Sequence, residues 1–345
     1  MEMMTTLLHG GLDGLVEYLS AHVLTCLVPA FFIAGAIAVF LSQNAVLRYF
    51  GPHAPKLLSY GVASVSGTIL AVCSCTVLPL FGGIYKRGAG LGPAVAFLYS
   101  GPAINVLAIV YSARLLGFDL GIGRAVGAVA FSVIIGTIMA AIYSRDDSRG
   151  DSRAFDMLQA DDDGQSMRVR LVFFALLVGI LIAAASSWWI VTGALLLALG
   201  FLLWKRFSRE DIRMWMLETW RFVKLITPWL LGGVFVAGML RVLLPESAVA
   251  GVVGGNSLLS NFVASFAGAL MYFATLTEVP IVKAFLELGM GRGPALALLL
   301  AGPALSIPNM LVIRSIMGTR RTLTYVALVV VMATISGYVY GMLVG

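Results

Sequence analysis

The sequence predicts an all-α, polytopic membrane protein with about ten transmembrane elements in two homologous halves. Of 345 residues, 60% are hydrophobic and 12% are charged, and the mean hydropathy is +0.96, outside the range of soluble domains. Apolar stretches long enough to cross about 30 Å of hydrocarbon recur along the chain. One stretch also recurs 201 residues later in related form.

Ten apolar segments each approach the roughly 20 helical residues that a bilayer requires. The Trp188 region is interpreted as two spans, and one long tilted helix is the alternative. The predicted spans are Ala21–Leu41, Leu57–Phe81, Leu91–Leu116, Ile122–Tyr143, Leu171–Ser187, Trp188–Trp204, Phe222–Leu244, Leu258–Lys283, Pro294–Ile316 and Leu323–Val344.

The internal repeat aligns Leu57–Gly117 with Leu258–Gly318 without a gap, and 20 of the 61 positions are identical. Many identities are glycines and prolines, which break helices, and two of the pairs are Pro79/Pro280 and Pro102/Pro303. A helix break in lipid survives only when it is buried in protein or faces a wet cavity. We therefore expect both pairs to point inward, towards a binding site between the halves.

The span count also predicts the symmetry of the two halves. Whether the broken segments cross the membrane or return is left open. If two per half behave alike, equivalent elements are an even number of crossings apart, and the halves are parallel about an axis along the membrane normal. An odd count would invert them.

Composition divides the chain into four parts. Residues 1–143 form the first half, 144–168 an acidic cytoplasmic loop, 169–214 the linking spans and 215–345 the second half. With ten crossings, 15 of the 23 lysines and arginines fall on the side of the N-terminus, so both termini are expected to be cytoplasmic in a cell (inner) membrane. This basic pattern reflects topology rather than nucleic-acid binding, and no removable signal peptide is expected.

The first proline break reads Cys73-Ser74-Cys75-Thr76-Val77-Leu78-Pro79. Paired thiols suit soft ligands such as trivalent arsenic, copper(I) or zinc. On a regular helix residues i and i+2 lie about 200° apart, so joint coordination requires local unwinding. Packing of two small apolar side chains is an equal alternative for this pair, and it is the preferred one for Cys26.

The equivalent break in the second half has no thiol but contains Glu278, between Thr275 and Thr277 on one side and Pro280 on the other. A charge inside an apolar span costs at least about 2.5 kcal/mol unless it is hydrated, paired or neutralised. We therefore predict that Glu278 carries a coupled proton near the solute. The alternative is a structural ion pair, with Lys283 as the nearest partner along the chain.

Polar residues also flank the second breaks, namely Ser100, Asn105, Ser306 and Asn309. They could line a solute path or satisfy freed backbone groups, and for each one alone the packing role is favoured.

The motifs Cys73-Ser74-Cys75-x-x-x-Pro79 and Gly92-Pro93-Ala94, followed by Gly101-Pro102-Ala103-x-Asn105, resemble the ArsP-like predicted permeases. Thr277-Glu278-Val279-Pro280 and Gly302-Pro303-Ala304 resemble the second half of that family. The resemblance implies a multi-span permease and a relation to bacterial exporters of trivalent organoarsenicals. Their metalloid-binding thiols would correspond to Cys73 and Cys75.

The favoured function is therefore secondary-active efflux of a small thiophilic solute, since no nucleotide-binding loop is present. Transport of another soft metal or of a sulfur-containing solute is the nearest alternative. A membrane thiol oxidoreductase using Cys73 and Cys75 ranks lower, as does a passive channel. No enzymatic activity, cofactor or nucleic-acid partner is expected. The lipid bilayer and the solute are the expected partners, and a homo-oligomer remains open.

Overall fold

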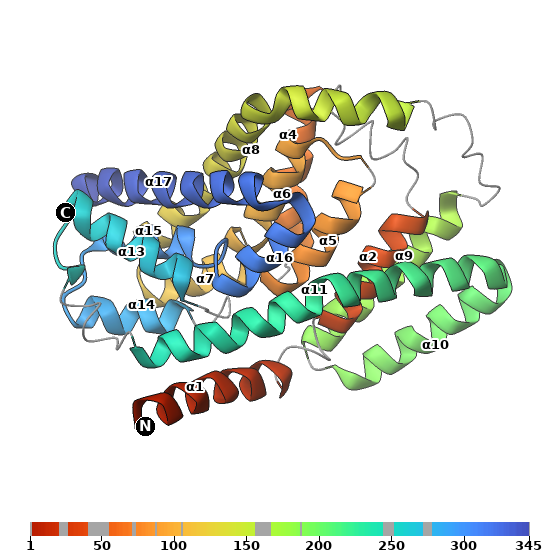
Figure 1. Cartoon of the computed structure of the whole chain (residues 1–345), viewed down its shortest axis with the longest axis horizontal. Helices are drawn as coiled ribbons and strands as arrows, with labels where there is room; N and C mark the ends of the chain where they lie inside the picture. The colour runs from red at the N-terminus through yellow and green to blue at the C-terminus, as the bar shows by residue number, and fades with distance from the viewer. Residues whose placement is uncertain are drawn as a thin grey trace.

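The computed structural model is helical throughout the residues that it describes, which are 2–20, 27–40, 55–70, 74–86, 88–104, 106–155, 167–186, 188–243, 252–271 and 278–344. Figure 1 shows how these helices are arranged. The helices are α1 (Glu2–Tyr18), α2 (Val28–Phe40), α4 (Lys56–Leu70), α5 (Ser74–Lys86), α6 (Leu91–Ala103), α7 (Val106–Leu115), α8 (Phe118–Phe155), α9 (Met167–Ala185), α10 (Trp189–Arg206), α11 (Arg209–Leu243), α13 (Leu258–Leu270), α14 (Glu278–Glu287), α15 (Arg292–Ala301), α16 (Ile307–Met317) and α17 (Thr319–Val344).

Three described helices are long and apolar enough to cross a membrane alone: Phe118–Tyr143 of α8, α10, and α17. A fourth candidate is the pair Leu91–Ala103 and Ala108–Leu115, which is bent by 44° at its break. Large apolar side chains on the outer faces are exposed, among them Ile190 and Leu197 on α10. An apolar outer surface suits lipid, because lipid does not penalise exposed hydrocarbon as water does.

Contacts between turns define two ends of the molecule. At one end, called here the Lys86 end, Arg321 donates a hydrogen bond to the Tyr85 hydroxyl. At the other, called the Asp119 end, Arg292 is paired with Asp119.

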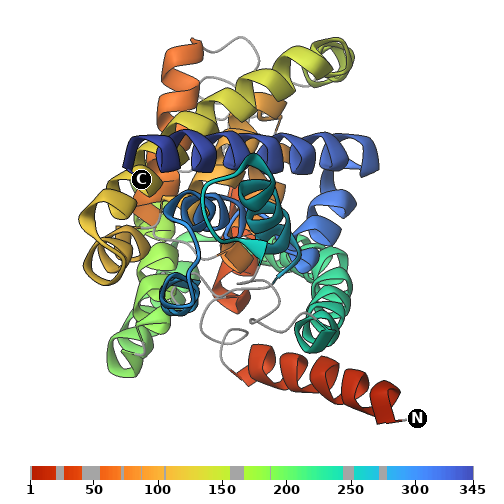
Figure 2. The ribbon, with the colours of Figure 1, turned by 90° about the vertical axis from the view of Figure 1, so that its left-hand side faces the viewer.

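Helices α8 and α17 run antiparallel to one another between these ends. Near the Lys86 end, Tyr143 of α8 is hydrogen-bonded to Thr324, with 2.8 Å between the hydroxyl oxygens. Near the Asp119 end, Tyr340 of α17 donates to Asp119 over 3.1 Å. In Figure 2, α17 lies as a straight helix across the molecule, in front of α8. In the sequence alignment these two helices are equivalent, so equivalent elements point in opposite directions.

The broken helix pair α6 and α7 passes from one end of the molecule to the other. It begins just after Lys86 and ends beside Asp119. The pair α15 and α16 does the same in reverse, from Arg292 to the turn before Arg321. The breaks occur at Pro102, which is buried near the end of α6, and at Pro303, which is buried beyond the end of α15. The inward position expected for this proline pair is confirmed.

The segment of α13 and α14 returns to the end at which it enters. The residues before α13 and after α14 are joined, since the Gly291 amide donates to the Val253 carbonyl over 3.1 Å and Gly254 bridges Met290. In the first half, Tyr60 near the start of α4 contacts Gly92 at the start of α6, just beyond the end of α5. Both pairs therefore form re-entrant hairpins, from the Lys86 end (α4 and α5) and from the Asp119 end (α13 and α14).

This difference between the broken segments corrects the expected symmetry. The expected parallel symmetry assumed that both broken segments of each half either cross the membrane or return. In the structure the first broken segment of each half returns to the end at which it enters, whereas the second passes to the other end. Equivalent elements are then an odd number of crossings apart. The parallel arrangement would place Tyr85 and Arg321 on opposite sides of the membrane, but they are in contact.

Several contacts recur at the repeat spacing of about 201 residues. The hydroxyls of Ser64 and Ser132 lie 2.7 Å apart. In the second half, the hydroxyl of Ser265, the counterpart of Ser64, lies 2.8 Å from that of Thr334, one residue beyond the counterpart of Ser132. Tyr99 donates a hydrogen bond over 3.2 Å to the carbonyl of Leu300, its own counterpart. Such a contact between equivalent residues lies close to the axis that would relate the two halves.

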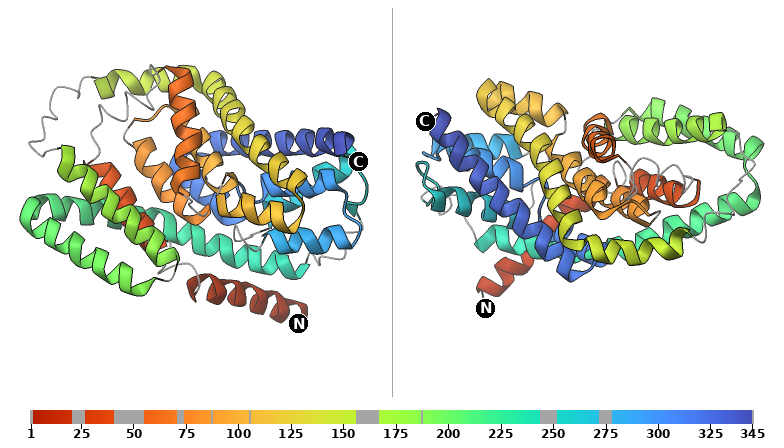
Figure 3. Two further views of the ribbon diagram at one scale, coloured as in Figure 1. Left: turned by 180° about the vertical axis from the view of Figure 1, so that it is seen from behind. Right: turned by 90° about the horizontal axis from the view of Figure 1, so that it is seen from above.

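The linking region forms two helices, α9 and α10, that pack against each other, as the two-span interpretation predicts. Both views in Figure 3 show α9, α10 and the first part of α11 standing to one side of the other helices. The structure differs from the predicted boundaries in two places. Helix α8 continues to Phe155, within the expected loop 144–168, and α11 runs unbroken through the 214/215 boundary.

Both described ends of the chain lie at the Asp119 end. The start of α1 and the end of α17 are on the same side of Figure 1. Helices α1 and α2 run antiparallel to α11, since Gly14 contacts Gly238, and Trp215 of α11 donates to the Phe32 carbonyl over 2.8 Å.

Candidate functional site

Glu278 is the first residue of α14 and is completely buried. It lies at the inner end of the second re-entrant hairpin, because α14 runs from there outward to the Asp119 end. A short helix that starts inside the molecule projects its first side chain into the interior. The hairpin therefore explains how an acidic residue reaches the centre of an apolar protein.

The partner of Glu278 is Arg124 on α8, a residue that the sequence reasoning did not select. Its Nη2 atom lies 3.6 Å from Oε2 of Glu278, and both side chains are 0% exposed. The suggested partner, Lys283, instead lies 4.0 Å from Glu287 at an exposed position. The signal for Arg124 was present in the sequence, since it is an ionisable residue inside a predicted span, as Glu278 is.

The Arg124–Glu278 pair is poorly satisfied by hydrogen bonds. Arg124 Nη1 donates to the Ser112 hydroxyl over 3.1 Å, and that hydroxyl donates to the Ala108 carbonyl over 2.7 Å. Among the described residues, Nε and Nη2 of Arg124 and both carboxylate oxygens of Glu278 have no hydrogen-bond partner. Buried polar groups are nearly always paired, so these atoms have free capacity for water, a proton or a solute.

Tyr99 of α6 and Tyr325 of α17 are two further buried polar side chains. Arg124 acts electrostatically on Tyr99 of α6, and Tyr99 acts on Tyr325 of α17. The Tyr99 hydroxyl donates a hydrogen bond to the Leu300 carbonyl, whereas the Tyr325 hydroxyl has no hydrogen-bond partner among the described residues. In the repeat alignment Tyr325 is the counterpart of Arg124. The buried polar side chains Glu278, Arg124 and Tyr99 thus come from three helices, α14, α8 and α6.

The polar residues beside the second breaks mostly satisfy backbone groups. Ser100 donates to the Ala63 carbonyl over 3.1 Å, and Ser306 caps α16 by accepting from the Asn309 amide over 3.4 Å. These contacts fit the packing role favoured for each of them. The side-chain oxygen of buried Asn309 has no partner in the described part of the chain.

The thiol segment lies at the inner end of the first hairpin. Ser74 and Cys75 are the first residues of α5, followed by buried Thr76 and buried Pro79. The regular helix therefore already includes Cys75 and Pro79. Cys73 and Cys26 lie outside the described residues.

The prolines of the first pair do not share an environment. Pro79 is buried, but Pro280, at the third position of α14, is exposed, so the expectation that both point inward is wrong for Pro280. Proline is tolerated in the first turn of a helix because amides there have no intrahelical partner. Asn105, Thr275 and Thr277 lie outside the described residues.

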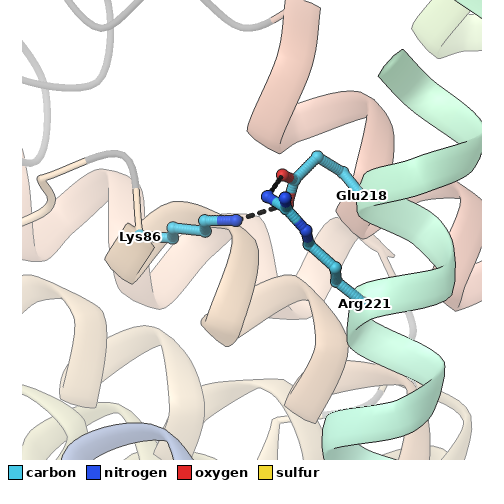
Figure 4. A network of polar contacts seen from close by, with 3 residues as sticks. All are labelled: Lys86, Glu218 and Arg221. Atoms are coloured by element: carbon cyan, nitrogen blue, oxygen red, sulfur yellow. Dashed lines mark hydrogen bonds and ion pairs between the residues drawn. The ribbon is translucent and has the colours of Figure 1, made fainter. Parts of the chain in front are cut away.

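A second polar cluster fixes the outer end of α5. Lys86, its last residue, is paired with Glu218 of α11, which is also paired with Arg221 (Figure 4). Burial of Glu218 disfavours its ionised form, but the hydrogen bonds and charges of Lys86 and Arg221 outweigh this and lower the pKa of that carboxyl. The thiol-bearing helix is therefore tied to α11 at the Lys86 end.

A family model described as "predicted permease" matches residues 10–342. The chain is 46% identical to UPF0718 protein MJ0584 of Methanocaldococcus jannaschii over 352 aligned residues, which cover 96% of this chain and 95% of the relative. It is 24% identical to UPF0718 protein YraQ of Escherichia coli, covering 81% of this chain and 69% of the relative. No solved structure matches it.

Proposed function

The chain belongs to the ArsP-like predicted permease family and is a membrane transporter, and from this we propose that it exports a small thiophilic solute by secondary-active transport. Trivalent organoarsenic is the first candidate. Another soft metal or a sulfur-containing solute is the alternative within the same class. We place the protein in the cell membrane.

The buried Arg124–Glu278 pair carries the proposal. Two charges with 0% exposure, separated by 3.6 Å and mostly without hydrogen bonds, are expensive to hold inside a membrane protein. A purely structural ion pair would gain stability from further hydrogen bonds, and among the described residues this pair has only the one from Arg124 Nη1 to Ser112. A pair that must open in each transport cycle benefits from weak mutual bonding.

Glu278 is the proposed proton carrier. When a proton binds a carboxylate oxygen, the charge of Glu278 disappears and its attraction to Arg124 is lost. Because Glu278 is the first residue of α14, at the inner end of the hairpin, the loss of its charge acts where the hairpin meets the core. The proton leaves when the carboxylate again pairs with Arg124.

The predicted internal repeat supports alternating access. Two hairpins that enter from opposite ends are suited to open in turn, each exposing the same central site. The thiols of Cys73 and Cys75 belong to one hairpin and Glu278 to the other. Solute binding and proton binding would therefore act on different gates.

The test is uptake of trivalent methylarsenic by everted membrane vesicles. We expect Cys73→Ser and Cys75→Ser to abolish uptake, because one hydroxyl cannot replace a thiolate ligand of a soft atom. Cys26→Ser is the matched control and should transport normally. Glu278→Gln should lose the dependence of uptake on a pH gradient.

Arsenite, copper(I) and zinc are tested in parallel to identify the class of solute. Equal transport of every solute by the wild type and both serine variants would rule out thiol coordination. An unchanged rate and pH dependence in Glu278→Gln would rule out the proton carrier.

A further inference from the structure

We propose that Arg124 is a recognition site for an anionic group, a carboxylate or oxyanion, on the transported solute, and that Glu278 competes with this group for the guanidinium. The inference rests on the proposed function, because it names a feature of the solute. A thiophilic solute alone would require no anion.

The free donors of Arg124 are the first observation. Its Nε and Nη2 groups are buried without a hydrogen-bond partner in the described part of the chain, and only Nη1 is used, by Ser112. Adjacent N–H groups of a guanidinium form a planar fork that matches two oxygens of a carboxylate or oxyanion. A buried fork whose two donors are used by no described residue is shaped for such a group.

The position of Glu278 is the second observation. Its carboxylate lies within ion-pair range of Nη2 but forms no hydrogen bond to it. It therefore supplies the negative charge that Arg124 needs inside the protein without filling the fork. An incoming anion can neutralise the charge of Arg124 in place of Glu278 only if Glu278 loses its own charge. Otherwise two anions beside one cation would leave an uncompensated buried charge.

This competition gives a fixed coupling ratio. One proton neutralises Glu278 for each anionic group that binds Arg124, so the net charge of the site stays constant. By linkage, anion affinity must fall as Glu278 ionises, by up to about tenfold for each pH unit.

Other charged groups near the pair do not alter this reasoning. Arg124 interacts electrostatically with Tyr99 on α6, and Tyr99 in turn interacts with Tyr325 on α17. Arg114 on α7 is exposed. Arg292 on α15 is also exposed and is paired with Asp119 of α8, which accepts a further hydrogen bond from Tyr340. Lys283 and Glu287 on α14 are exposed and close to each other.

Two matched probes separate the anion site from the thiol site. Phenylarsine oxide and its 4-carboxyl derivative are both trivalent and thiophilic, and only the second carries a carboxylate. We measure the binding of each to the purified full-length protein by thermal shift across a pH series. At acidic pH, wild type should bind the carboxylated probe at least about tenfold more tightly than phenylarsine oxide. This preference for the carboxylated probe should disappear as the pH rises.

The variants are chosen so that folding does not confuse the result. Glu278→Gln should keep the preference at every pH, because its side chain no longer ionises. The double variant Arg124→Gln/Glu278→Gln removes both charges, leaves neither uncompensated, and should bind the two probes equally. Cys26→Ser serves as the control with unchanged preference.

Formate provides a probe that does not involve the thiols. Formate should stabilise Glu278→Gln but not the double variant. This result is expected even if neither arsenical binds, because failure of arsenical binding would refute only the thiophilic solute. The proposal is overturned if the double variant retains the carboxylate preference, or if neither the carboxylated probe nor formate depends on Arg124.

Discussion

Arg124 and Glu278 are each tolerated only because the other is present. Glu278 was identified from the sequence, since a lone acidic residue in an apolar span is conspicuous. Arg124 was missed because it lies near the start of a predicted span, where a basic residue passes for part of a loop. The two are 154 positions apart in the chain, so no local pattern connects them.

The charges should therefore show strong energetic coupling. We expect Arg124→Gln alone to cost about 3 to 5 kcal/mol of stability, because it leaves Glu278 charged and buried. Arg124→Gln/Glu278→Gln should cost clearly less than that single change. Thermal unfolding of the purified variants at neutral pH measures both. Additive losses in the double variant would mean that the pair does not interact in the folded protein.

At the scale of elements, close helix crossings join α6 to α8 and α15 to α17. A Cβ at Gly337 of α17 would lie 2.5 Å from the Gly293 carbonyl oxygen of α15, and one at Gly92 of α6 would lie 2.8 Å from that of Gly136 in α8. These two crossings correspond in the repeat. Glycine is needed there because backbone approaches backbone, as in many membrane helix pairs.

A single methyl group should distinguish such a crossing from an open helix face. We expect Gly337→Ala to destabilise the protein by about 1 to 3 kcal/mol, because the backbone facing it cannot move aside easily. Gly200→Ala on α10 is the control, since a Cβ there meets nothing within 4 Å. The melting temperatures of the two variants give the comparison, and equal values would contradict the close packing of α15 and α17.

At the scale of the whole molecule, the re-entrant hairpins change the predicted orientation. Contacts place five basic residues at the Lys86 end, namely Lys86, Arg221, Arg314, Arg320 and Arg321. The sequence around the start of α11 adds Lys205, Arg206, Arg209 and Arg213. The positive-inside rule predicts that this end is cytoplasmic. Both described ends of the chain lie at the other end, so the same rule that favoured cytoplasmic termini now favours external ones.

Sided labelling tests this orientation. In a background with Cys26, Cys73 and Cys75 changed to serine, an impermeant maleimide should label Phe118→Cys and Leu288→Cys from outside intact cells. Thr319→Cys should react only in everted vesicles. Phe118 and Thr319 are counterparts in the repeat, so labelling of both from one side would restore the parallel arrangement.

The sequence alone determined the membrane class, the family and the presence of an acidic residue, Glu278, inside an apolar segment. These follow from local properties: apolar length, the backbone limits of proline, and the cost of a buried charge. Only the tertiary structure decided that the first broken segment of each half returns while the second crosses, and that Arg124 is the partner of Glu278. Hydropathy measures how much apolar chain is present, but the direction of that chain depends on contacts between distant turns, such as Asp119 with Arg292.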